Sequence, residues 1–195
     1  MKNGKLYFIR HSITEAVEKR WMYGLTDLPL TEGGFDLIRE LKKEGIYPSC
    51  EDKDVYSSGL LRADQTLTTI YGDIPFVVER NFREMGVGKF ECKHYTELAD
   101  DEDFKLWAND TTGSVVCPGE GGECLNDFCA RVKHGFYELI SKQQRDAIIV
   151  CHGGTMASLL FDRFGGASVY DWIPKPGRGY VFIIEDGELK SAEPF

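Results

Sequence analysis

The five apolar residues Ala147–Cys151 (AIIVC) constrain the fold of this chain more than any other segment. The run is short, rich in β-branched side chains and free of polar residues, which is typical of a strand buried on both faces. Strands of this kind belong to parallel sheets that helices cover on either side. Residues 5–10 (KLYFIR), 54–57 (DVYS) and 76–78 (FVV) predict further strands. We therefore expect a mainly parallel central sheet.

Helical patterns alternate with these strands. Apolar residues recur at helical spacing in residues 31–45, 59–71, 126–143 and 155–164. This alternation predicts an α/β fold with three layers, α/β/α, in which helices cover both faces of the sheet. A strand at residues 180–184 and a turn at Asp186 and Gly187 predict a closing hairpin. With 195 residues, we expect a single domain over 1–195.

Acidic residues outnumber basic ones in the chain. There are 32 Asp and Glu against 23 Lys and Arg, so the formal net charge is −9. Nucleic-acid binding needs a basic face and a membrane helix needs a long apolar segment, so neither nucleic acid nor a membrane is an expected partner. The six cysteines form no zinc-binding pattern and are interpreted as free thiols. Because the first residues lead directly into a short strand, we expect a cytoplasmic protein.

Two of the four histidines directly follow predicted strands. His11 comes after the first strand, beside Arg10, and His152 comes after Ala147–Cys151. Ligands of open α/β sheets bind outside the carboxyl ends of the strands. Since both strands are expected to be central and parallel, both imidazoles should emerge at one edge of the sheet. The alternative is that each histidine only ends a strand and packs against a loop.

Arg62 is expected at the same edge, near the start of the helix that follows the second strand. Ser58 is a plausible cap for this helix. The helix dipole favours an anion at that end, so Arg62 gains nothing from the helix, and an anionic ligand would explain it. Taken alone, Arg62 is better explained by a surface ion pair with a neighbour such as Asp64.

Two other parts of the chain bear on this edge. Residues 85–122 are acidic and irregular and interrupt the alternation, so we expect a small insertion over the active-site edge. Arg178 precedes the last long strand and is expected at the opposite edge.

Several aromatic residues fall in loops near the predicted site, where packing is a more common role than lining a pocket: Trp21, Tyr23, Phe90, Tyr95 and Trp107.

Short motifs connect these residues in a fixed order. They are residues 10–14 (RHSIT), 24–31 (GLTDLPLT), 57–63 (SSGLLRA), 82–85 (FREM), 88–91 (GKFE), 121–123 (GGE) with Arg131 and Val132, and 150–154 (VCHGG). As an ordered set over about residues 5 to 165, they resemble the histidine phosphatase superfamily, which includes the cofactor-dependent phosphoglycerate mutases. The stretch at 82–85 resembles the small phosphatases more than the mutases, including those that act on α-ribazole phosphate, and a sugar-phosphate phosphatase is equally compatible.

The resemblance implies a role for each candidate residue. His11 would attack phosphorus and become a phosphohistidine. Arg10, Arg62 and His152 would hold the phosphoryl oxygens as charge redistributes. Glu84 matches the proton donor of the family and would protonate the leaving alcohol, then activate water. No metal and no cofactor are expected, because these side chains supply the positive charge.

The chain departs from the family pattern at several positions. Ser12 replaces the common glycine after the nucleophile, and Val17 replaces an asparagine that helps to hold the phosphate, so one donor is missing. Cys92 and Cys124 replace a glycine and a serine of two other motifs. These changes leave the nucleophile and the acid in place, but they affect the expected shape of the pocket and its affinity for substrate.

The predicted reaction is hydrolysis. Members of the family that act as mutases have an arginine after the acid, where this chain has Met85, and they have more basic residues in the insertion. We therefore expect a metal-independent phosphomonoesterase that hydrolyses a small phosphorylated metabolite through a phosphohistidine intermediate. The alternatives are phosphoglycerate mutase-type phosphotransfer and a non-enzymatic module that binds a phosphorylated ligand. Exposed edge strands also allow a homodimer.

Overall fold

A computed structural model describes residues 2–195 of the chain. Its central sheet has six strands in the order β4-β3-β6-β1-β7-β8. In chain order these are β1 Gly4–Arg10, β3 Asp54–Ser57, β4 Val77–Val78, β6 Ala147–Cys151, β7 Gly179–Glu185 and β8 Glu188–Pro194. The strands β4, β3, β6 and β1 are parallel, whereas β7 runs antiparallel to β1. The predicted mainly parallel sheet is confirmed.

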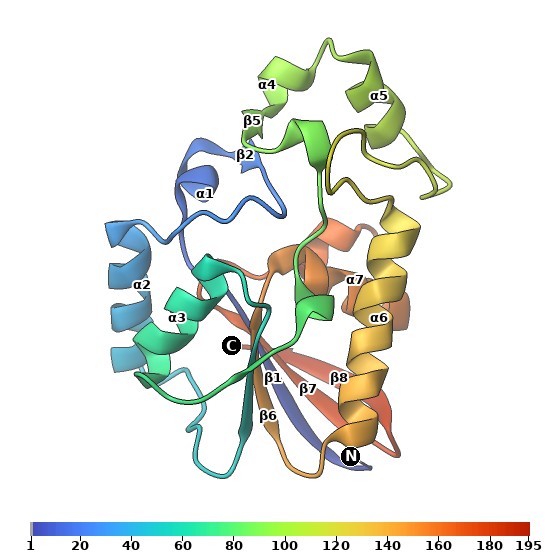
Figure 1. The fold of residues 1–195 in the computed structure, drawn as a ribbon. Helices are drawn as coiled ribbons and strands as arrows, with labels where there is room; N and C mark the ends of the chain where they lie inside the picture. The colour runs from blue at the N-terminus through green and yellow to red at the C-terminus, as the bar shows by residue number, and fades with distance from the viewer. Residues whose placement is uncertain (1) are drawn as a thin grey trace.

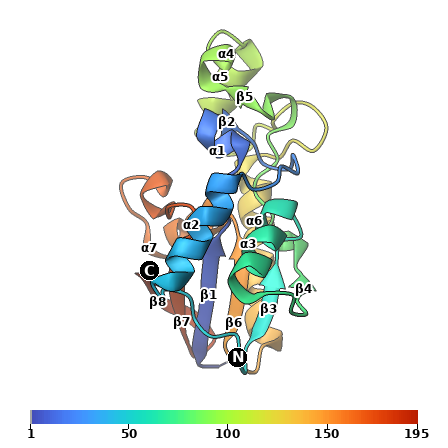
Figure 2. The same cartoon turned by 90° about the vertical axis from the view of Figure 1, so that its left-hand side faces the viewer.

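Helices cover both faces of this sheet (Figures 1 and 2). The helices α2 (Glu32–Lys43) and α3 (Leu61–Tyr71) lie on one face, and α6 (Leu125–Lys142) and α7 (Gly153–Phe164) lie on the other. The predicted three-layer α/β/α fold is therefore confirmed. Thr31 caps α2, since its side chain accepts a hydrogen bond from the Gly34 amide.

The strand β6 separates two hydrophobic cores, as its continuous apolar sequence predicts. Every residue of β6 is buried. Because side chains alternate along a strand, Ile148 and Val150 pack with α2 and α3, while Ala147, Ile149 and Cys151 pack with α6 and α7. The strand holds a central position between β1 and β3 and is parallel to both, so these three strands end at the same edge of the sheet.

The segment 85–122 lies beyond the end of the sheet at which β1 finishes (Figures 1 and 2). It contains η2 (Gly88–Phe90), β5 (Lys93–His94), α4 (Tyr95–Leu98) and α5 (Glu102–Ala108). A small hydrophobic core holds it together, made of Met22, Val87, Phe90, Leu98 and Cys117. The short helices differ from the irregular structure that the sequence predicts there, because this local core is assembled partly from residues distant in sequence.

The loop after β1 is also more structured than its sequence indicates. It contains α1 (Glu15–Lys19) and β2 (Trp21–Met22), and β2 pairs with β5 of the insertion. The remaining short helices are η1 (Arg80–Phe82) and η3 (Val169–Trp172). None of the helices in residues 2–195 is both long and apolar enough to cross a membrane.

Two predictions about individual residues are wrong. Ser58 does not cap α3, because the helix begins three residues later and its first turn has Leu60 at the cap position. Arg178 lies at the same edge as the end of β1, not the opposite one, because β7 is antiparallel: the Arg10 amide donates a hydrogen bond to the Arg178 carbonyl at 2.9 Å. The side chain of Arg178 pairs with Glu44 at 3.5 Å.

Candidate active site

The adjacent ends of β1 and β6 bring His11 and His152 together. The two strands are parallel and Arg10 is in register with Cys151. The His11 amide continues the ladder by donating to the Cys151 carbonyl at 2.9 Å, so each histidine is the first residue beyond its strand. The imidazole centroids lie 5.2 Å apart, and both rings are buried. The shared edge that the sequence predicts is therefore present.

The hydrogen bonds of His11 determine which ring nitrogen is free to react. Its Nδ1 lies 2.7 Å from the carbonyl oxygen of Ser12, which only accepts, so Nδ1 carries the proton. In the neutral ring, Nε2 therefore has a lone pair. The Tyr23 hydroxyl lies 3.2 Å from Nε2 and donates to it, while Thr14 Oγ1 donates to the Tyr23 oxygen at 3.1 Å. The backbone thus leaves Nε2 as the ring nitrogen with a lone pair, directed at the Tyr23 hydroxyl.

Arg62 is a buried cation, not a surface one. It is 0 % exposed, and it is not paired with any carboxylate in the part of the chain that the structure describes. Its guanidinium donates to the carbonyls of Gly24 at 2.6 Å and Thr26 at 3.0 Å. The alternative of an ion pair with Asp64 is wrong, because that carboxylate accepts from Ser57 instead.

The carboxylate of Glu91 fixes the loop that holds Arg62. It accepts hydrogen bonds from the amides of Gly24 and Leu25 at 3.0 and 2.8 Å, and from that of Thr26 at 3.3 Å. The amides of this loop therefore bind an anion, while its carbonyls bind a cation. Since Glu91 belongs to the insertion, the insertion contributes to the position of Arg62.

Unpaired buried nitrogen atoms gather beside His11. Among residues 2–195, four buried side-chain nitrogen or oxygen atoms have no hydrogen-bond partner, and three of them are Arg10 Nε, Arg62 Nε and His152 Nδ1. Buried polar groups are usually satisfied, and an arginine Nε–H can only donate, so the two unpaired arginine groups indicate a missing acceptor, while His152 Nδ1 donates or accepts according to its tautomer. An anion with several oxygen atoms would satisfy all of them at once.

Burial and the neighbouring cations lower the pKa values of both histidines. The pKa of His11 falls well below 6.5, mainly through burial and also through Arg62 and Arg10. The pKa of His152 falls in the same direction, from burial, Arg62, His11 and Arg10. Both rings are therefore neutral at neutral pH, and the lone pair on His11 Nε2 remains available.

These lowered pKa values predict a loss of stability in mild acid. Below about pH 6.5 the unfolded chain takes up protons on His11 and His152 that the folded chain does not, so the free energy of unfolding should fall by up to about 1.4 kcal/mol per pH unit for each ring. Urea denaturation at about pH 7.5 and about pH 5.5 measures this loss. In the variant His11→Asn, the free energy of unfolding should depend less steeply on pH than in the wild type. Equal slopes in the variant and the wild type would contradict the lowered pKa of His11.

Ser58 contacts His152 rather than capping a helix. Its hydroxyl lies 2.8 Å from His152 Nε2. This contact leaves His152 Nδ1 as the ring nitrogen without a partner. Ser58 follows β3, which pairs with β6 in parallel, so the same sheet edge positions both residues. The sequence placed Ser58 next to Arg62 but held no signal for this contact, which depends on the pairing of β3 with β6.

Glu84 lies opposite the start of α7, in the loop after η1. Its carboxylate accepts from the Gly154 amide at 2.9 Å and from the Met85 amide at 3.0 Å. A Cβ atom at position 154 would clash with this carboxylate, so the glycine permits the approach. Glu84 also interacts electrostatically with Arg10 and Arg62. The fifth residue predicted from the sequence thus lies within electrostatic range of two of the other four, Arg10 and Arg62.

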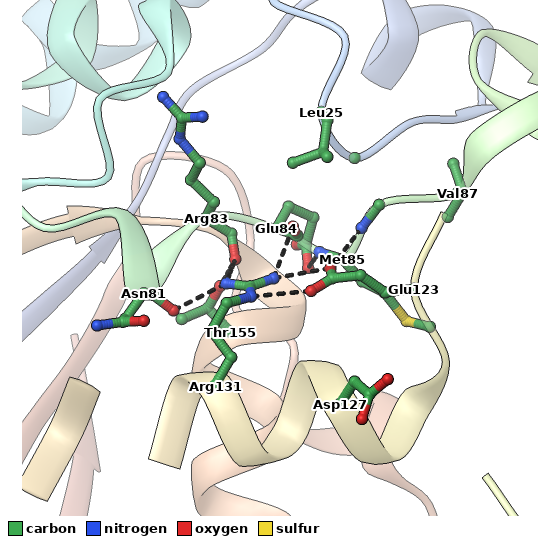
Figure 3. A network of polar contacts seen from close by, with 12 residues as sticks. Leu25, Asn81, Arg83, Glu84, Met85, Val87, Glu123, Asp127, Arg131 and Thr155 are labelled. Atoms are coloured by element: carbon green, nitrogen blue, oxygen red, sulfur yellow. Dashed lines mark hydrogen bonds and ion pairs between the residues drawn. The ribbon is translucent and has the colours of Figure 1, made fainter. Parts of the chain in front are cut away.

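A network around Arg131 fixes the backbone of the Glu84 loop (Figure 3). Arg131 donates to the carbonyls of Asn81 at 2.9 Å and Arg83 at 3.1 Å, and it pairs with Glu123 at 2.8 Å. Glu123 in turn accepts from the Gly86 amide at 2.8 Å. The two residues therefore hold the loop from both sides of Glu84.

The structure separates the aromatic residues named from the sequence into two groups. Phe90 is fully buried in the core of the insertion, and Trp21 packs against Lys19. Tyr95 and Trp107 line a hollow, and Tyr23 contacts His11 and lies 4.7 Å from the Arg62 guanidinium. The contact of Tyr23 with His11 was not predicted from the sequence, since packing was expected for most of these rings.

The comparison with known families agrees with the geometry of the site. Residues 6–173 match the family model described as the histidine phosphatase superfamily, branch 1. The chain belongs to this superfamily. The match extends over most of the chain and includes all five predicted site residues, so the resemblance inferred from the ordered motifs is confirmed.

Two relatives of this chain carry phosphatase names. A protein of Hydrogenobacter thermophilus, named "Putative phosphoserine phosphatase 2", is 31% identical over 160 residues, which are 80% of this chain and 76% of the relative. The adenosylcobalamin/alpha-ribazole phosphatase of Salmonella typhimurium is 27% identical over 161 residues, 80% of this chain and 77% of the relative. The alpha-ribazole phosphatase structure from Shigella flexneri has the same fold, with a TM-score of 0.78, 24% identity and coverage of 95% and 94% of the two chains. This histidine phosphatase is therefore an enzyme with phosphatase or phosphotransfer activity.

Proposed function

We propose that this histidine phosphatase is a metal-independent phosphomonoesterase that hydrolyses a small phosphorylated metabolite through a phosphohistidine on His11. The observation that carries the proposal is the cluster of buried side-chain nitrogen atoms without partners, from Arg10, Arg62 and His152, beside His11. A phosphoryl group has three oxygen atoms that accept hydrogen bonds, and fixed cations stabilise the charge that it spreads in the transition state.

The proposed reaction has two steps. First, His11 Nε2 attacks phosphorus, the P–O bond to the alcohol breaks, and the proton of Glu84 passes to the leaving oxygen. Second, the Glu84 carboxylate takes a proton from water, which attacks the phosphohistidine and releases phosphate. Glu84 regains its proton and His11 its lone pair, so the cycle is closed. The 2.7 Å bond from Nδ1 to Ser12 supports this direction of attack, because it leaves Nε2 free.

Tyr23 supplies the donor that the absence of asparagine at Val17 removes. Its hydroxyl lies 3.2 Å from His11 Nε2, where a phosphoryl oxygen would arrive, and would transfer its hydrogen bond from the ring to that oxygen. The variant Tyr23→Phe keeps the ring beside Arg62, and we expect kcat/KM for phosphate esters to fall by about tenfold to hundredfold. Tyr180→Phe, which removes a hydroxyl from the α6–α7 core, is the matched control. Unchanged kinetics in Tyr23→Phe would contradict this role.

Hydrolysis and isomerisation are separated by one assay. Purified protein is given 3-phosphoglycerate and a catalytic amount of 2,3-bisphosphoglycerate, and both phosphate release and formation of 2-phosphoglycerate are followed. We expect phosphate release to be faster, and to persist in excess EDTA because Arg10 and Arg62 supply the positive charge. Faster isomerisation, or activity lost to EDTA and restored by a divalent cation, would overturn the proposal.

A further inference from the structure

A cavity of about 530 Å³ opens directly beside Glu84. Apolar side chains make up most of its wall, among them Met85, Leu125, Phe128, Ala157, Phe161 and Ile173. Pockets for small organic ligands have volumes of about 300–1,000 Å³ and are mainly apolar, so this one is large enough for more than a phosphoryl group. Because Glu84 forms part of the wall, whatever fills the cavity lies beside the proposed proton donor.

A second hollow continues the first toward the insertion. Its volume is about 240 Å³, and Phe104 and Trp107 of α5 form part of its wall. The two hollows share the wall residues Met85, Leu125, Val169 and Tyr170, so they adjoin each other, and together we call them the Met85 trough. The trough extends from Glu84 to Phe104 and Trp107 of α5.

The charged residues in the wall of the Met85 trough are all acidic. They are Glu84, Asp162 and Asp110, and no lysine, arginine or histidine among residues 2–195 contributes to either hollow. Lys133 pairs with Asp162 but is not part of the wall. An anionic group in the trough would lose water without gaining a cation, and it would lie near carboxylates of the same sign.

We propose that the natural substrate is the phosphate monoester of an apolar or aromatic alcohol whose leaving group has no second anionic group. The proposal rests on the proposed function, because it places the leaving group beside Glu84. The phosphoryl group occupies the cluster of cations at His11, and the alcohol lies in the Met85 trough. Phosphoserine and phosphoglycerates, which carry a carboxylate, are poor ligands on this account.

Binding of phosphonates, which are not hydrolysed, tests the trough independently of turnover. Calorimetry with methyl-, butyl- and hexylphosphonate should show Kd falling about fourfold for each added methylene, the factor expected for burial of apolar surface. Butylphosphonate should also bind at least about tenfold more tightly than 3-phosphonopropanoate, which has a similar length and a terminal carboxylate. A Kd that does not change with chain length, or tighter binding of the carboxylate, would overturn the proposal.

The variant Leu125→Lys shows where these ligands bind. Leu125 is the first residue of α6, is 49% exposed and lines both hollows, so a lysine there places a cation in the trough without disturbing a buried site. Its affinity for 3-phosphonopropanoate should rise and its preference for hexylphosphonate should shrink. Leu106→Lys, at an exposed position on α5 outside the trough, should bind all four ligands as wild type does. Equal effects of the two variants would contradict the assignment.

Failure of this proposal is distinguishable from failure of the proposed function. Phosphate release from hexyl phosphate, butyl phosphate and phosphoserine is measured beside the phosphonate series. If all three esters are cleaved by a His11-dependent reaction with no preference for chain length, the function stands and the Met85 trough does not select the substrate. If the phosphonates follow the expected series but no ester is cleaved, the ligand class stands and hydrolysis is wrong.

Discussion

Replacing His11 with alanine is expected to reduce phosphate release from any phosphate ester by at least about 10³-fold. The variant loses the only atom proposed to bond to phosphorus, His11 Nε2, and His152 is proposed to hold a phosphoryl oxygen rather than to attack. His152 lies 5.2 Å away, centroid to centroid, but its Nε2 is hydrogen-bonded to Ser58. The loss should appear in kcat, because Arg10 and Arg62 still bind the phosphoryl group.

The matched control for this prediction is His134→Ala. His134 is an exposed residue of α6 beside Glu138, remote from the site, and its removal should leave the activity unchanged. Circular dichroism and a thermal melt of both variants show that each is folded. If His11→Ala released phosphate as fast as His134→Ala, the covalent mechanism would be wrong, and the chain would have to use water directly.

Replacing Glu84 with glutamine is expected to slow cleavage most for esters whose leaving group is strongly basic and has to be protonated as it departs. Loss of a general acid costs about 10²–10⁴-fold for an alkyl phosphate, whose alkoxide is a poor leaving group. The first turnover with 4-nitrophenyl phosphate should change little, since nitrophenolate leaves without a proton. The Gly154 and Met85 amides donate to different oxygens of Glu84, so glutamine keeps only one of these two hydrogen bonds. Arg131 and Glu123 still hold the loop through the Asn81 and Arg83 carbonyls and the Gly86 amide.

Rapid-quench measurement of the first turnover with both esters tests this prediction. Glu102→Gln, at an exposed position on α5, is the control and should behave as wild type with both. An equal loss with the alkyl and the nitrophenyl ester would show that Glu84 acts through binding or position rather than as an acid. The difference between the two esters is therefore more informative than the size of either effect.

The fold followed from the sequence because local signals agreed with the global arrangement. The apolar run Ala147–Cys151 required burial on both faces, and only a central parallel strand provides it. His11 and His152 then came to one edge because parallel neighbouring strands end together. The antiparallel β7 gave no comparable signal, since short apolar strands do not reveal their direction. Arg178 was misplaced for that reason.

The parts of the site that the sequence did not predict all depend on contacts between distant segments. Ser58 resembles a helix cap, but it contacts His152 because β3 pairs with β6. Arg62 resembles a surface residue, but the loop at Gly24 covers it, and Glu91 fixes that loop. Tyr23 resembles a packing residue until the loop brings its hydroxyl to His11. The spacing of residues along the chain does not reveal these contacts between distant segments.

The most direct test of the account is to locate the phosphoryl group on the enzyme. Glu84→Gln is mixed with 4-nitrophenyl phosphate, whose leaving group needs no acid, so the phosphoenzyme should still form. Because the variant has no carboxylate to activate water, hydrolysis of the phosphoenzyme should be slow. The protein is quenched in alkali, where phosphohistidine survives, digested, and mapped by mass spectrometry. The account predicts one phosphoryl group per chain, on His11. A phosphoryl group on His152, or release of nitrophenol with no phosphorylated histidine, would contradict it.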